Sequence, residues 1–104
     1  TGLGVAAPAE KLEVAGNVKL TTAGNKIFIA TGANASAGTA TLVGGTVTVN
    51  TTAVTTNSIF YVTCKTPIVT QGSYSVPTIV NGVSFTINST SVAENSVVYW
   101  TLIN

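Results

Sequence analysis

Residues 97–103 read VVYWTLI, and this stretch decides the fold. On an extended strand its apolar side chains point to both sides, with Val97, Tyr99 and Ile103 opposing Val98, Trp100 and Leu102. The run SIFYVTCK, residues 58–65, does the same, with Ile59, Tyr61 and Thr63 opposing Phe60, Val62 and Cys64. An antiparallel sheet with one wet face should alternate apolar and polar residues. We therefore expect a second copy of the chain to cover the other face; the alternative is a central strand with exposed aromatic side chains.

Outward from this stretch, short runs of β-branched and aromatic residues recur along the chain, with polar turns between them. The predicted strands are 39–43, 46–50, 58–65, 73–80, 83–88 and 97–103. Between 73–80 and 83–88, Asn81-Gly82 predicts a tight hairpin turn with positive φ at both positions. Helix signals are almost absent. The pattern predicts an all-β chain with an antiparallel β-sandwich, jelly-roll-like head at residues 32–104, and it argues against βαβ units.

The N-terminal part of the chain differs from the rest because it carries most of the charge. The stretch PAEKLEV, residues 8–14, holds three of the seven charged residues of the chain, which has four Lys and three Glu. The runs KLEVAG, VKL and KIFIA between residues 11 and 30 predict short, half-buried strands with a wet face and turns between them. Residues 31–45 then have the small side chains of a linker that leads into the first head strand. We place the boundary between the two parts at residue 31.

Low charge limits the classes of partner. Only 7% of the residues are charged, against a typical ~25%, while 45% are hydrophobic, which argues against disorder. The net charge is +1 without clustered basic residues, so we expect no nucleic-acid binding. No apolar run approaches the ~20 residues of a bilayer span, so we expect no membrane insertion. The chain has no Met and its first residues do not resemble a signal peptide, so we expect a fragment or a processed product.

The residues that catalysis needs are scarce. Without His or Asp, neither a Ser/His/Asp nor a Cys/His arrangement can be built. A carboxylate pair could come only from Glu10, Glu13 and Glu94, and the first two would point to opposite faces of an extended segment. We therefore predict no enzymatic activity, no metal site and no cofactor. The single Cys64 is expected to be a buried small hydrophobe.

Two loops offer the polar and aromatic residues from which a sugar site on a β scaffold is usually built. The candidates for receptor binding are Gln71, Tyr74, Asn88 and Asn95. The alternative is that these residues only cap turns. Two apolar strands supply the candidates for the core or a subunit interface, namely Phe60, Tyr61, Val62, Tyr99, Trp100 and Leu102.

The pieces PAEKLEV at residues 8–14 and GNVKL at residues 16–20 are followed by TAGNK and by ATGANASAGTATLVGGTVTVNTTAVT, and the chain ends in VVYWTLIN. With these pieces, nearly the whole chain resembles the distal part of phage and prophage tail fibres. This resemblance implies an intertwined, parallel homotrimer in which residues 1–31 close a shaft and form a trimerisation segment. It also implies a C-terminal head at the tip of the fibre that touches the host. The family supplies no catalytic residues.

Together these observations predict the receptor-binding tip of a trimeric viral fibre. It would attach a virion to a cell-surface glycan or another envelope component of the host. One alternative is a structural knob that ends the fibre and sets its register. Another is a carbohydrate-binding module of a secreted or surface-bound bacterial protein. A hydrolase is disfavoured by the missing residues.

Overall fold

The computed structural model describes residues 2–7, 11–66 and 71–104, and every element in these ranges is a β-strand. The strands are β1 Gly2–Leu3, β2 Glu13–Val14, β3 Ala37–Thr41, β4 Thr46–Asn50, β5 Ile59–Thr66, β6 Tyr74–Val80, β7 Ser84–Ser89 and β8 Val97–Ile103. No helix long and apolar enough to cross a membrane occurs in the described part of the chain. The all-β class is therefore confirmed, and strands 46–50 and 97–103 form with the predicted bounds.

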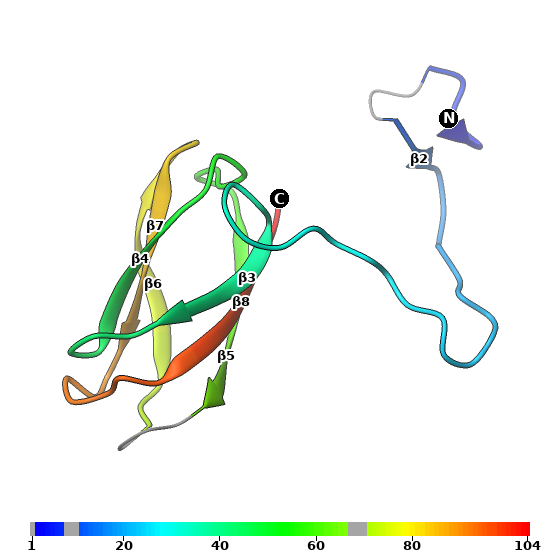
Figure 1. Cartoon of the computed structure of the whole chain (residues 1–104). Helices are drawn as coiled ribbons and strands as arrows, with labels where there is room; N and C mark the ends of the chain where they lie inside the picture. Colours follow the sequence, from blue (N-terminus) through cyan, green and yellow to red (C-terminus); the bar gives the residue numbers. More distant parts are fainter. Residues whose placement is uncertain (1, 8–10, 67–70) are drawn as a thin grey trace.

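Strands β3 to β8 form two antiparallel three-stranded sheets that face each other (Figure 1). One sheet has the order β3-β8-β5 and the other the order β4-β7-β6, so β8 and β7 are the central strands. Every connection from β3 to β8 crosses between the sheets except the β6–β7 hairpin. This alternation is the pattern of a jelly roll reduced to six strands, which confirms the predicted sandwich.

The core lies between the two sheets and is small. Its buried apolar side chains are Leu42, Val54, Phe85, Ile87, Val98, Trp100 and Leu102. The Phe85 ring lies between Phe60, with ring centroids 4.6 Å apart, and Trp100, at 5.1 Å in an edge-to-face arrangement. Each such side chain contributes about 1.5–3 kcal/mol through its removal from water. The core therefore depends on aromatic contacts that join β5 and β8 to β7.

The alternation predicted for the two apolar strands is present. On β8, Val98, Trp100 and Leu102 are buried, while Tyr99 and Ile103 are exposed. On β5, Phe60 and Val62 pack against the core, and Tyr61 lies on the outer face. Cys64 shares their inward side but is only half-buried, so the expectation of a buried thiol was too strong. The reason is its place near the end of an edge strand, where β5 also has a register irregularity between Cys64 and Thr66.

The first head strand begins earlier than predicted, at Ala37 instead of residue 39. It ends at Thr41 because Leu42 turns into the core, where its backbone N–H donates to the Ser96 carbonyl at 2.9 Å. Val43 then belongs to the β3–β4 turn and is exposed. Near the start of the strand, a Cβ at Gly38 would lie 3.2–3.3 Å from the Trp100 indole, so a glycine lets this ring pack directly under β3.

The hairpin turn at Asn81-Gly82 forms, but only Gly82 has positive φ, at 68°. The Val83 N–H donates to the Val80 carbonyl at 2.9 Å, which gives a turn with a single left-handed residue at its third position. The prediction of positive φ at both positions was therefore wrong. The physical reason is visible in the β4–β5 loop, since the Asn81 side chain accepts the Thr56 N–H and Gly82 N–H donates to the Val54 carbonyl.

The N-terminal segment makes fewer strands than predicted. Glu13–Val14 pairs with Gly2–Leu3 in a short parallel ladder, but the runs at 18–20 and 26–30 are extended without strand partners. These runs leave Val18, Leu20, Ile27, Phe28 and Ile29 exposed. Residues 11–30 extend away from the sandwich (Figure 1). Their alternating apolar residues suit strands, but a strand forms only where a second segment pairs with it, and none pairs with these runs in the described part of the chain.

Gly45 provides a test of the packing at the β3–β4 turn. It has φ 79°, and a Cβ there would lie 2.4 Å from the Ser91 carbonyl oxygen. We expect Gly45→Ala to lower the free energy of unfolding by about 2–5 kcal/mol, through left-handed strain plus the clash. Gly82→Ala is the matched control, because Gly82 has φ 68° but no atom near its Cβ position, so it should cost only about 1–2 kcal/mol. Equal losses in urea unfolding would contradict this packing.

Candidate functional site

The outer face of sheet β3-β8-β5 is unusually apolar for a surface. Strand alternation places Thr39 of β3, Tyr99 of β8 and Thr63 of β5 in one row across it. The next rows bring Thr101 beside Tyr61, and Ile103 beside Ile59. Of these, Ile59, Tyr61, Tyr99 and Ile103 are large apolar side chains left exposed. The face thus combines aromatic and aliphatic side chains with a row of threonine hydroxyls.

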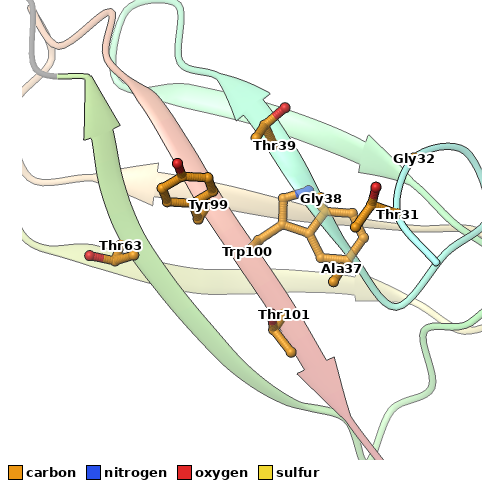
Figure 2. Close-up of a pocket in the computed structure, with 9 residues that line it drawn as sticks. All are labelled: Thr31, Gly32, Ala37, Gly38, Thr39, Thr63, Tyr99, Trp100 and Thr101. Atoms are coloured by element: carbon orange, nitrogen blue, oxygen red, sulfur yellow. The ribbon is translucent and has the colours of Figure 1, made fainter. Parts of the chain in front are cut away.

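A groove of about 650 Å³ opens on this face (Figure 2). Its lining residues are Thr31, Gly32, Ala37, Gly38, Thr39, Thr63, Tyr99, Trp100 and Thr101. Most belong to β3, β5 and β8, but Thr31 and Gly32 come from the segment that joins the N-terminal part to the sandwich. That segment is held beside β3 by a parallel bridge between Thr31 and Ala37 and by a hydrogen bond from Gly32 N–H to the Ala37 carbonyl, 3.3 Å.

Aromatic rings and hydroxyls dominate the lining of the groove. The Tyr99 side chain is 47% exposed, and its ring lies 5.7 Å from the Lys65 Nζ, a cation–π contact. Trp100 also borders the groove but is buried, and its indole Nε1 has no hydrogen-bond partner. No lining residue is a carboxylate or an amine. An aromatic surface with hydroxyl donors suits the apolar faces and hydroxyls of a sugar.

One end of the sandwich is organised by Glu94, which is completely buried. Its carboxylate accepts three hydrogen bonds, from the Gly72 N–H at 2.8 Å, the Ser89 hydroxyl at 2.6 Å and the Tyr74 hydroxyl at 2.6 Å. Its backbone carbonyl also accepts the Gly45 N–H at 2.9 Å. Glu94 therefore ties together the start of β6, the β7–β8 loop and the β3–β4 turn.

This environment shifts the pKa values of two groups, the Glu94 carboxyl and the Tyr74 phenol. Burial alone would raise the pKa of Glu94, but the hydrogen bonds from Gly72, Ser89 and Tyr74 outweigh it and lower the pKa from 4.5 to about 2. Burial, followed by the hydrogen bond to Glu94, raises the pKa of the Tyr74 phenol well above its ordinary value. The carboxylate therefore stays charged and the phenol protonated at neutral pH, and the network is a fixed structural unit.

The four residues predicted to bind a receptor lie at this same end, and three of them have partners within the chain. Tyr74 donates to Glu94, Asn88 accepts the Thr46 hydroxyl at 2.8 Å, and Asn95 accepts the Gly44 N–H at 3.1 Å. Gln71 is exposed. Their role in receptor binding stays a prediction, but their geometry is that of residues that hold turns together.

The candidates for a core or subunit interface divide between the two sides of the first sheet. Trp100 and Leu102 are buried, and Phe60 and Val62 pack against the core. Tyr61 and Tyr99 are exposed on the outer face and are the two that could meet a partner. Tyr99 also lines the groove, which the sequence did not reveal, because the bridge that brings Thr31 beside Ala37 has no signature in the sequence.

The described residues offer little chemistry beyond binding. They contain no group of three or more His, Cys, Asp or Glu side chains that could hold a metal ion. Glu94 is the one buried carboxylate among the described residues; it is occupied by three donors and does not belong to the lining of the groove. The groove is lined by hydroxyls and aromatic rings, and no nucleophile with a base beside it is among its lining residues.

Comparison with protein families gives a match that covers the sandwich. The family model described as "K1 capsule-specific polysaccharide lyase, C-terminal domain" matches residues 34–103. The matched span begins just before β3 and ends with the last residue of β8, so it contains all six strands of the sandwich and most of the groove. A search of curated proteins finds no match.

Acid unfolding tests the Glu94 network. The folded pKa of about 2 lies below the ordinary 4.5, so the carboxylate stabilises the fold above pH 4.5, and this stability is lost as the pH falls toward 2. We expect a loss on the order of 3 kcal/mol over this range, measured by urea unfolding at each pH. Glu94→Gln should be less stable at pH 7, because its amide meets three donors, and should show a much flatter pH dependence. An unchanged pH dependence in the variant would contradict the assignment.

Proposed function

Because this chain belongs to the family of the K1 capsule-specific polysaccharide lyase C-terminal domain, and is thereby related to phage tail-spike proteins, we propose that it is a polysaccharide-binding head of a viral fibre. In this proposal the head attaches the virion to a glycan of the host cell surface. The name of the matched family points to a capsular polysaccharide as the class of ligand.

The observation that carries the proposal is the groove on the outer face of sheet β3-β8-β5. A sugar ring stacked on Tyr99 would place its hydroxyls near those of Thr39, Thr63 and Thr101. Tyrosine suits this role because it offers an apolar ring at low conformational cost. The groove is also close to preformed, because both of its walls are fixed by backbone pairing to β3 and β8. Binding would therefore require little ordering of the protein.

Trimer formation is the second part of the proposal, and the N-terminal segment supports it. Its exposed apolar side chains at residues 18–29 have no cover in a single chain. Packing the same segment from three parallel copies around one axis would cover them. Three heads on one shaft would then bind a repetitive polymer together, with effective concentrations of order mM for short connections. Weak single sites would suffice for firm attachment.

We expect the protein to be retained by at least one member of an array of bacterial capsular polysaccharides that includes the K1 capsule. Tyr99→Ala should weaken this binding about tenfold or more, because it removes the aromatic surface of the groove. Val80→Ala is the matched control, since Val80 is also 47% exposed but lies on the opposite sheet. Retention by no glycan, or equal losses in the two variants, would contradict the proposal.

The mass in solution tests the trimer. Light scattering after size exclusion should give three times the chain mass of 10.5 kDa. Phe28→Asp should dissociate the assembly, because it places a charge where the proposal buries an aromatic ring. Val92→Asp is the control: Val92 is 83% exposed and Phe28 85%, but Val92 lies on a head loop, so its variant should keep the trimer mass. A monomeric wild-type protein would contradict this part of the proposal.

A further inference from the structure

A second groove lies on the side of the sandwich, between β5 and β6. It has a volume of about 460 Å³ and is lined by Phe60, Tyr61, Val62, Tyr74, Ser75 and Val76. Strands β5 and β6 are the edges of their respective sheets, so half of their backbone N–H and C=O groups point away from the ladders. The groove therefore offers polar backbone groups and a serine hydroxyl beside two tyrosines, which is again a surface for a hydroxyl-rich ligand.

The side chains on both sides of this groove are held in place by contacts within the chain. On the β6 side, Tyr74 is held by the 2.6 Å bond of its hydroxyl to the buried Glu94. On the β5 side, Phe60 is fixed by its ring contact with Phe85. The β6 ladder is also irregular between Ser75 and Thr78, where Pro77 stands in the strand. A proline there keeps β6 from pairing with another strand, so the opening between the edges stays available.

Tyr61 connects the two grooves. Tyr61 and Thr63 are two residues apart on β5, so their side chains share the outer face, roughly 7 Å apart along the strand. Thr63 lines the first groove and Tyr61 lines the second. The Tyr61 side chain is 62% exposed, which leaves its ring free to contact a molecule that passes from one groove to the other.

We propose that the groove between β5 and β6 is a second sugar subsite, and that one polysaccharide chain runs from the Tyr99 groove across Tyr61 into it. The inference rests on the proposed function and extends it, because it assigns a ligand of several linked sugar residues in place of a single terminal sugar. Tyr61 acts as the aromatic contact between the two subsites. Ser75 and the unpaired backbone groups of the two edge strands bind sugar hydroxyls in the second.

The test uses fragments of increasing length, prepared from whichever capsular polysaccharide the full chain binds on the array, with titration by calorimetry. For the wild type, affinity should rise with fragment length beyond the shortest binding fragment. Tyr61→Ala should weaken the binding of long fragments about tenfold and leave the shortest one unchanged. Ser75→Trp, which fills the second groove, should have the same length-dependent effect. Tyr99→Ala should instead weaken every length.

Several outcomes would overturn this inference, and they are separable from failure of the proposed function. If the wild type binds no polysaccharide at all, both the proposed function and the second subsite are wrong. If it binds but its affinity is already constant at the shortest fragment, or if Ser75→Trp leaves long fragments unaffected, only the second subsite is wrong. If Tyr61→Ala lowers the mass in solution and weakens all lengths equally, Tyr61 belongs to a subunit contact. Light scattering of each variant makes this last distinction.

Discussion

The edge-to-face contact between Trp100 and Phe85 is the interaction on which the sandwich depends. Trp100 lies on the central strand of one sheet and Phe85 on the central strand of the other, so their contact joins the two layers where each is most completely paired. Gly38 opposite Trp100 leaves room for the indole to lie under β3. With so few fully buried apolar side chains, the core alone would be marginal for a head of this size. Further interactions must therefore hold the two sheets together at the ends of the strands.

Hydrogen bonds of polar loop residues provide these interactions at both ends of the sandwich. At one end the buried Glu94 accepts hydrogen bonds from the β5–β6 connection, from β6, from the end of β7 and, at its backbone carbonyl, from the β3–β4 turn. At the other end, the Thr51 hydroxyl donates to the Ala35 carbonyl at 2.6 Å, and Asn104 accepts the Thr55 hydroxyl at 3.1 Å. A buried carboxylate costs free energy unless it is fully hydrogen-bonded, and here two hydroxyls and a backbone N–H meet that condition without any cation. This also explains how a chain with so little charge keeps one charged residue inside.

The parts of the fold that the sequence predicts are those that follow from the two-residue period of a strand. Trp100 and Leu102 inside, and Tyr99 and Ile103 outside, follow from the alternation in VVYWTLI alone. Contacts between distant loops leave no such pattern. In the sequence Glu94 is only one of three scattered carboxylates, and the meeting of its loop with Gly72 and Tyr74 makes it central. The groove escapes prediction for the same reason, since Thr31 reaches it through a bridge to Ala37. Asn81 does not take the positive φ that the sequence predicts, because its side chain accepts a hydrogen bond from Thr56 in a neighbouring loop.

The scarcity of charge connects the two halves of the molecule. The N-terminal segment exposes Ile27, Phe28 and Ile29 to solvent, at a cost that a neighbouring copy of the segment would remove. Strands β3, β5 and β8 of the head contain a single charged residue, Lys65, whose Nζ lies 5.7 Å from the centroid of the Tyr99 ring. Threonine hydroxyls keep such a face soluble and still allow close approach of a hydroxyl-rich polymer. If the proposal holds, the same composition serves packing between copies of the N-terminal segment and recognition of a hydroxyl-rich polymer at the head, and Thr31 and Gly32, which form one wall of the groove, join the two parts.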